Sequence, residues 1–245
     1  TPTALAHHMW SHALRPNIDT AIDATCGNGN DSVAIASMLF NDNDGPTRVS
    51  QLLCIDMQQE ACEVTRDRLT ELLPEDTMTC NVNVLCTSHS PLPRPRDVSS
   101  VGLVCYNLGY LPQSDQAVLT QMETTISSIT DAALLVRVGG LISVTTYPRS
   151  NKNEDYAVHA LLEGLALLSS KSVDWRRDYV EELGPDIDTH DGEEDESYSV
   201  RDTVRAALER IVHEGGPPKQ TWRVMENKML GRALSPILLT ATRIK

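Results

Sequence analysis

The chain has 245 residues, of which 40% are hydrophobic and 22% charged, so it is long enough for one large domain with a full core. This composition excludes a disordered polyelectrolyte, and no stretch reaches the roughly 18 apolar residues of a membrane span. The formal charge of −13 argues against a protein that holds nucleic acid through a generally basic surface.

The acidic residues are unevenly distributed. Nine of the 34 lie in residues 181–196, a segment without Lys or Arg, and the remainder of the chain carries only −4. Such a segment is typical of a solvated insertion, which we place at about 181–200. A mildly acidic core with a few loop cations can still bind one RNA loop.

The alternation of apolar strands with amphipathic helices predicts one α/β domain over residues 1–245, with a mainly parallel seven-stranded sheet and helices on both faces. Strands are expected at 18–24, 51–55, 81–86, 101–106, 141–146, 221–225 and 237–242. Helices are expected at 4–14, 33–39, 60–73, 114–138, 154–168 and 204–212. Residues 173–183 show no clear period and are left unassigned.

A glycine-rich turn, Cys26-Gly27-Asn28-Gly29-Asn30, follows the first strand. A dinucleotide-binding GxGxxG turn would need a third glycine where Ser32 stands, so an NAD-dependent oxidoreductase is disfavoured. Asp56 ends the second strand, where doubly wound folds place an acceptor for ribose hydroxyls. The alternative for Asp56 is an ordinary surface carboxylate.

The fourth strand ends in a second motif, Asn107-Leu108-Gly109-Tyr110. Strand-end loops on the carboxyl side of a parallel sheet face one crevice, so this motif is expected beside the glycine turn. The Asn107 amide oxygen and the Leu108 carbonyl can accept N–H bonds and aim the lone pair of an amine, while Tyr110 can offer its ring to a cation. Alternatively, Asn107 merely caps a turn and Tyr110 packs.

Several segments together resemble the family labelled "putative rRNA methylases", which includes methyltransferases of tRNA 5-aminomethyluridine. They are Asp23 to Ile35 (DATCGNGNDSVAI), Ser88-His89, Asn107 to Asp115 (NLGYLPQSD), Thr124-Thr125, Gly139-Gly140 and Tyr147. The resemblance implies a Rossmann-like class I methyltransferase fold with S-adenosyl-L-methionine as cofactor. It also implies N-methylation of the aminomethyl group of 5-aminomethyluridine at wobble position 34, with the tRNA anticodon loop as partner.

The resemblance and the two motifs predict the site residues by position. The expected cofactor residues are Asp23, Thr25, Cys26, Gly27, Asn28, Gly29, Asn30, Asp31, Asp56, Met57, Gln58, His89, Asn107 and Gly109. The expected methyl-transfer residues are Asn107, Leu108 and Tyr110, and the expected substrate residues are Tyr110, Tyr147, Arg149 and Lys152. His89 has the alternative of a loop-end histidine bonded to backbone, and no metal site is expected because ligand spacing is absent.

RNA contact is expected from cations in predicted loops, although each is equally explained as a solvated surface charge. The candidates are Arg94, Arg96, Arg149, Lys152, Lys228 and Arg232. Other functions stay open: methylation of a ribosomal base or of a protein or small-molecule amine, or a noncatalytic cofactor-binding module. A homodimer is possible, and the missing initial Met with the acidic insertion favours an organelle, such as the chloroplast stroma, over the cytoplasm.

Overall fold

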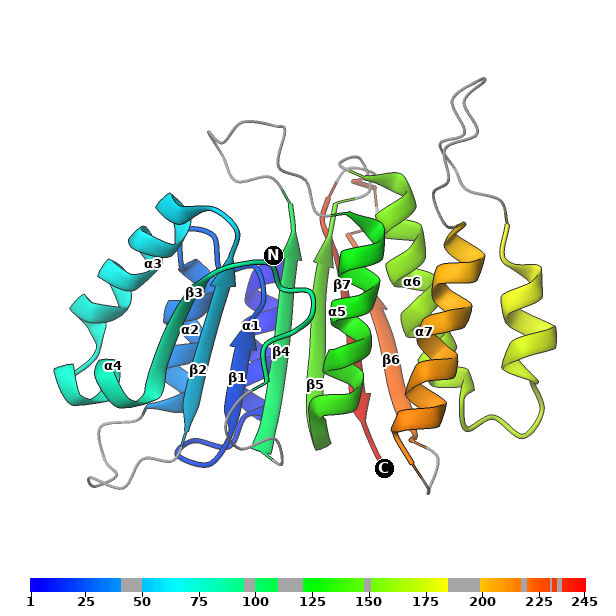
Figure 1. Cartoon of the computed structure of the whole chain (residues 1–245), viewed down its shortest axis with the longest axis horizontal. Coiled ribbons are helices and arrows are strands. Elements are labelled where there is room, and N and C mark those ends of the chain that lie inside the picture. The colour runs from blue at the N-terminus through cyan, green and yellow to red at the C-terminus, as the bar shows by residue number, and fades with distance from the viewer. Residues whose placement is uncertain are drawn as a thin grey trace.

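The architecture is a twisted seven-stranded sheet with helices on both faces (Figure 1), as the alternation of strands and helices predicts. It is seen in a computed structural model that describes residues 1–40, 50–94, 100–109, 121–147, 151–184, 199–216, 220–229, 231–232 and 235–245. Among these residues no helix is both long enough and apolar enough to cross a membrane.

The strand order is β3-β2-β1-β4-β5-β7-β6. The strands are β1 (Thr20–Asp23), β2 (Gln51–Asp56), β3 (Val82–Cys86), β4 (Val101–Leu108), β5 (Val136–Thr146), β6 (Trp222–Asn227) and β7 (Ile237–Arg243). Strand β7 runs antiparallel to β5 and β6, and the other pairs are parallel. The order reverses between β1 and β4, and sheets of this kind bind ligands at the carboxyl ends of the strands beside such a reversal.

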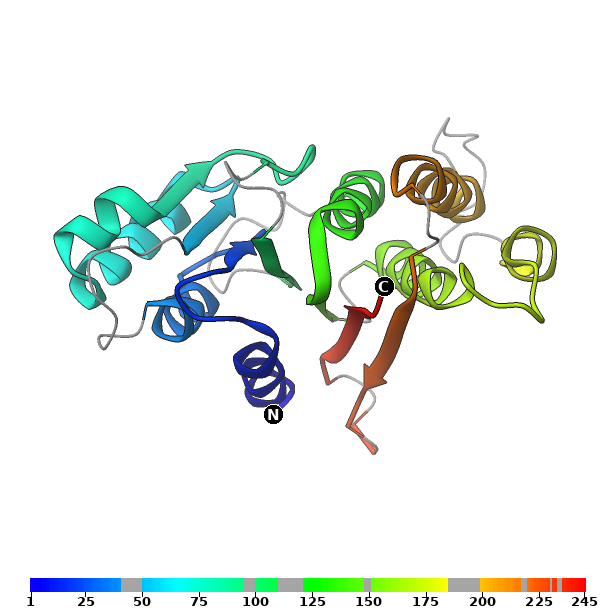
Figure 2. The same ribbon diagram turned by 90° about the horizontal axis from the view of Figure 1, so that it is seen from below.

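Two apolar cores lie on opposite faces of the sheet, with α1 and α2 on one side and α5 and α7 on the other (Figure 2). The helices are α1 (Pro2–Ala13), α2 (Asn30–Leu39), α3 (Gln59–Leu72), α4 (Glu75–Asn81), α5 (Met122–Leu135), α6 (Lys152–Leu167) and α7 (Val200–Glu214). Helix α3 contributes to the core of α1 and α2, and α6 to that of α5 and α7.

Several elements differ from the sequence prediction, and three of the differences have local reasons. Helix α1 starts at Pro2 because the Thr1 hydroxyl caps it by accepting the Ala4 N–H at 3.2 Å. Pro74 ends α3 but also precedes α4, a helix that the sequence reading missed. The unassigned region holds a π-helix at Trp175–Tyr179 and a short 3-10 turn at Val180–Glu182, so the acidic segment begins inside ordered structure. Residues 185–198 of that segment lie outside the described residues.

The predicted helix 114–138 is wrong at its end, because α5 stops at Leu135 and β5 already begins at Val136. The pairing of β4 with β5 shifts between Val101 and Leu103, and the extra residues of β5 are taken up where Gly139 has φ +78°. The two glycines therefore form a bulge within the strand rather than a helix end.

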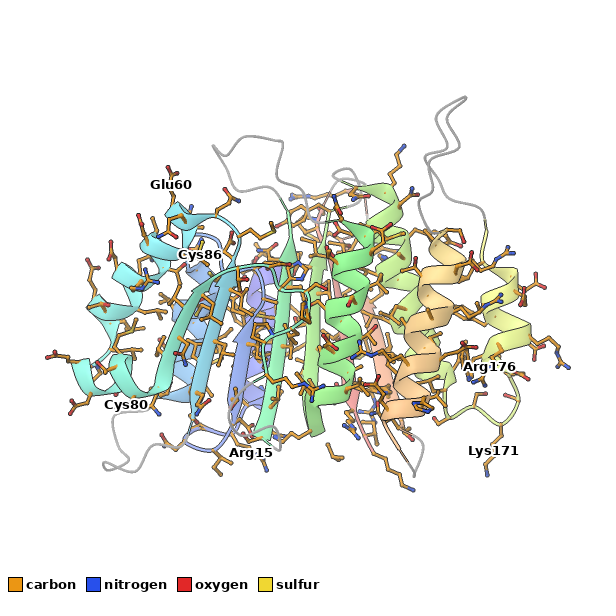
Figure 3. The ribbon with its side chains drawn as sticks, in the orientation of Figure 1. Arg15, Glu60, Cys80, Cys86, Lys171 and Arg176 are labelled. Atoms are coloured by element: carbon orange, nitrogen blue, oxygen red, sulfur yellow. The ribbon has the colours of Figure 1, made fainter. Side chains whose placement is uncertain are left out.

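That bulge places Arg137 in an ion-pair cluster that fixes α1 at the amino-terminal edge of the sheet. Asp19, whose side chain is fully buried, accepts hydrogen bonds from Arg15 and from Arg137. Arg137 also donates to the backbone oxygen of Ala13 at 2.8 Å, at the end of α1. Arg15 lies at the lower edge of the molecule, opposite the carboxyl ends of the central strands (Figure 3). Helix α1 is thus anchored at its carboxyl end.

Candidate functional site

The glycine turn between β1 and α2 is shaped by two left-handed residues and by a helix packed beneath it. Gly27 has φ +49° and Gly29 has φ +75°, which favour glycine. The Thr65 hydroxyl of α3 donates to the Gly27 oxygen at 2.8 Å, and a Cβ on Gly29 would lie 2.9 Å from the same hydroxyl. Both glycines are therefore required by the local geometry.

Asp23 lies beneath this turn rather than on its surface. Its buried carboxylate accepts the Ser32 hydroxyl at 2.6 Å, which ties the end of β1 to the first turn of α2. Burial, together with the charge of Asp31, raises the pKa of Asp23 to about 7, while the Ser32 hydrogen bond opposes the rise. Asp23 thus supports the glycine turn from below.

Asp56 joins the end of β2 to the glycine turn. One carboxylate oxygen accepts the Gly27 N–H and the other accepts the Gln58 N–H, each at 2.9 Å. A carboxylate has about four acceptor positions, so two remain for a ligand's hydroxyl groups. The next side chain, Met57, is 58% exposed and provides an apolar surface beside the carboxylate.

The two predicted motifs meet directly, because the Asn107 N–H at the end of β4 donates to the Thr25 hydroxyl at 2.7 Å. Asn107 and Gly109 are exposed, whereas the Leu108 side chain is buried. Tyr147, which follows β5, hydrogen-bonds Asn107, and a Cβ on Gly109 would come within 2.7 Å of the Tyr147 ring. The close approach of this ring explains why a glycine stands at 109.

His89 enters the same region after β3, with only 5% of its surface exposed. Its Nδ1 has no hydrogen-bond partner among the residues described, and its ring meets that of Tyr106 edge-on at 6.0 Å. Burial lowers the pKa of His89, although the charge of Asp56 acts in the opposite direction. A buried, unpaired ring nitrogen is costly, and a ligand atom would satisfy it.

A model of the family described as "Putative rRNA methylase" matches residues 52–176, slightly more than half of the chain. The chain belongs to this methylase family. A relative from Arabidopsis thaliana, named "tRNA (mnm(5)s(2)U34)-methyltransferase, chloroplastic", is 34% identical over 147 residues. The match covers 59% of this chain and 52% of the relative, so the chain spans about half the length of that protein.

Solved structures agree with the family in fold. A "putative rRNA-methylase" from Clostridium thermocellum superposes with a TM-score of 0.61 at 23% identity, over 100% of this chain and 98% of that one. A "putative methyltransferase" from Streptococcus mutans "in complex with SAH" gives 0.58 at 22% identity, over 99% and 98%. The predicted Rossmann-like methyltransferase fold is therefore confirmed.

The residues at the carboxyl ends of β1 and β2 suit the binding of S-adenosylmethionine. Asp56 has free acceptor positions for ribose hydroxyls, Met57 offers apolar surface for a base, and the glycine turn permits close backbone approach. The predicted contacts Asn28 and Asn30 are exposed beside the turn, Asp31 is partly exposed, and Cys26 is buried. No group of three or more potential metal ligands is found in the part of the chain that the structure describes.

Two predicted residues of the methylase site, Tyr110 and Arg149, lie outside the described residues, as does Arg96. Lys152 is not in a loop but at the first position of α6, where it is exposed. Arg94 and Arg232 are exposed, and Lys228 pairs with Glu226 at 2.8 Å.

The α3 residues that hold the glycine turn were not predicted from the sequence. Besides Thr65, Arg68 donates to the Asn28 oxygen at 2.5 Å and to the Asn30 side chain at 2.7 Å. Thr65 is a fully buried polar residue within the apolar stripe Ala61, Cys62 and Leu69. That interruption of the stripe is the one signal by which the sequence could have indicated Thr65.

Proposed function

We propose that this chain is the methyl-transferring part of an S-adenosylmethionine-dependent enzyme that converts 5-aminomethyluridine to 5-methylaminomethyluridine at wobble position 34 of tRNA. The observation that carries the proposal is the 34% identity to a relative named as a methyltransferase of this wobble nucleoside. The site at the carboxyl ends of β1, β2 and β4 supports it, because it combines a glycine turn, a ribose acceptor and an exposed amide.

The chemistry requires a neutral amine with its lone pair aligned on the methyl group that the cofactor supplies. Asn107 is suited to orient such an amine because its backbone is fixed by Thr25 and its side chain by Tyr147. We assign the amine to the space beside Asn107 and Gly109, with the Leu108 carbonyl and Tyr110 as further contacts. Asp56, Met57, Gln58, His89 and the glycine turn are assigned to the nucleoside end of the cofactor.

The substrate is proposed to be the anticodon loop of tRNA, bound by local contacts rather than by a basic face. Single-stranded loops are gripped through stacking and through the pocketing of one base, which needs few cations. Lys152, at the start of α6, and Lys228, after β6, stand at the same edge of the sheet as the carboxyl end of β5. We assign these two, with Arg94, Arg96, Arg149 and Arg232, to phosphate contacts.

Three further properties belong to the proposal. A single domain over 1–245 and a homodimer are its expected organisation. A chloroplast or other organellar location is favoured over the cytoplasm because the relative's name is "chloroplastic". The nine acids of 181–196 would keep nonspecific RNA away from the rest of the surface.

A second candidate, methylation of ribosomal RNA, is favoured by the description of the matching family. Both candidates are tested by incubating the protein and S-adenosylmethionine separately with tRNA and with ribosomal RNA, each from cells lacking the modification, and analysing nucleosides by mass spectrometry. The proposal predicts loss of 5-aminomethyluridine and gain of its methylated form in tRNA alone. A methylated nucleoside in ribosomal RNA alone would refute it, and no methylation with intact cofactor binding would indicate a noncatalytic module.

A further inference from the structure

A histidine from the N-terminal helix reaches the first turn of α2, directly after the glycine turn. His7 Nε2 lies 2.7 Å from the Asp31 carboxylate, and the two side chains are 30% and 17% exposed. The His7 ring packs against Trp10, a buried residue of the same helix, at 4.8 Å between ring centroids. The pair is therefore held in place and still open to solvent.

The pair lies beside the proposed methyl-transfer site. Asp31 stands in the first turn of α2, directly after the glycine turn, and Asn107 donates its N–H to Thr25 just before that turn. Besides burial, the charge of Asp31 raises the pKa of Tyr147, the residue that hydrogen-bonds Asn107. Among the described residues, the charge of Asp31 adds to burial in raising the pKa of Asp23 from β1 and that of Cys105 from β4. Since Arg137 fixes the carboxyl end of α1, the helix holds the His7 ring at this position.

The proposed reaction needs a proton acceptor at this place. An alkylamine has an ordinary pKa near 10.4. The amine of the substrate therefore arrives mainly as an ammonium ion, which has no lone pair for the methyl group. Asp23 is buried and bonded to Ser32, and Asp56 is engaged with two backbone N–H groups. His89 is buried after β3. Asn107 has no basic group to offer.

We propose that His7, oriented by Asp31, accepts the proton that the alkylammonium form of the substrate must lose before methyl transfer. This inference rests on the proposed function. The N–H bond of the ammonium breaks and its proton passes to the imidazole, which becomes a cation paired with the Asp31 carboxylate. The amine nitrogen then bonds to the methyl carbon while the methyl–sulfur bond breaks and sulfur keeps the electron pair. The His7 side chain, which is 30% exposed, returns the proton to solvent.

The test is the pH dependence of kcat/KM for tRNA carrying 5-aminomethyluridine, measured for the wild type and for His7→Gln between about pH 6 and about pH 9. General-base catalysis is typically worth about a hundredfold or more, so we expect a loss of about that size near pH 7. The loss should shrink by about tenfold per pH unit as solvent supplies the free amine. Asp23, with its raised pKa, is present in both proteins and cancels from the comparison.

The matched control is His8→Gln, one position further along α1, because His8 is exposed and its ring meets only that of His12 among the ring contacts of the described chain. We expect the control to keep the wild-type profile, and His7→Gln to bind S-adenosylhomocysteine within about twofold of the wild type in calorimetry. A His7→Gln profile lowered by a constant factor at every pH, or left unchanged, would overturn the inference and leave the proposed function standing. A wild-type protein that methylates no 5-aminomethyluridine would remove both.

Discussion

Replacing Asp56 by asparagine should weaken cofactor binding while leaving the fold in place. The carboxylate accepts the Gly27 and Gln58 N–H groups at 2.9 Å, one on each oxygen. An asparagine has a single side-chain oxygen, so one of these N–H groups would face the new NH2 group and lose its acceptor. The substitution also removes the negative charge proposed to accept the ribose hydroxyls.

The expected size of the effect follows from these bonds. A hydrogen bond to a charged group contributes about 1.5 to 3 kcal/mol. The loss of one such bond to the ribose therefore raises the dissociation constant of the cofactor by about tenfold to about a hundredfold at 25 °C. Asp56 holds the Gly27 N–H, and Thr65 holds the Gly27 oxygen. Weakening the bond to the N–H would let the Gly27 backbone shift, which adds to the loss of cofactor affinity.

Isothermal titration calorimetry with S-adenosylhomocysteine measures the effect directly. Asp67→Asn is the matched control, since it makes the same charge change at an exposed position of α3. We expect the control to bind like the wild type and both variants to show cooperative thermal unfolding. An Asp56→Asn protein that folds and binds the ligand with wild-type affinity would refute the assignment of Asp56 to the ribose.

Two further predictions concern the supports of the site. Thr65→Val should lower the free energy of unfolding by about 1 to 3 kcal/mol and weaken S-adenosylhomocysteine binding, because the Gly27 oxygen loses its buried donor. Thr65→Ser keeps the hydroxyl donor and should therefore keep the wild-type values of both quantities, measured by thermal melting and by calorimetry. Burial acts to raise the pKa of Asp19, but hydrogen bonds from Arg137 and Arg15 outweigh it and lower the pKa below 3.8. Its stabilisation is therefore complete above about pH 4 and lost in stronger acid. Asp19→Asn should cost about 3 to 5 kcal/mol in neutral urea melts. The difference should shrink as the pH falls below about 4, and a pH-independent difference would contradict this account.

The sheet was predictable from the sequence because its strands are short apolar runs separated by clear turns. The error at 136–140 arose because the apolar period of α5 continues into Val136 and Val138, and a Gly-Gly pair commonly ends a helix. Pairing with β4 and the ion pair between Arg137 and Asp19 decide instead for a bulged strand. Both are long-range contacts that a local pattern does not contain.

The candidate site was predictable to a similar extent. Topology alone brings Asp56 and Asn107 to the glycine turn, because parallel strands end at one edge. His7 was expected only as one of three histidines of the N-terminal helix, with His8 and His12, that could line the site. The supporting contacts from Thr65 and Arg68 were not predicted, since each depends on how α3 is rotated against the turn. These side chains come from elements outside either motif.

The most direct test of the proposed function uses two otherwise identical tRNAs, one with 5-aminomethyluridine and one with unmodified uridine at position 34. Each is incubated with the protein and S-adenosylmethionine carrying an isotopically labelled methyl group, and the wobble nucleoside is analysed by mass spectrometry. We predict label on the aminomethyl nitrogen of the first tRNA and none in the second. Label at another position, or equal label in both tRNAs, would contradict the account.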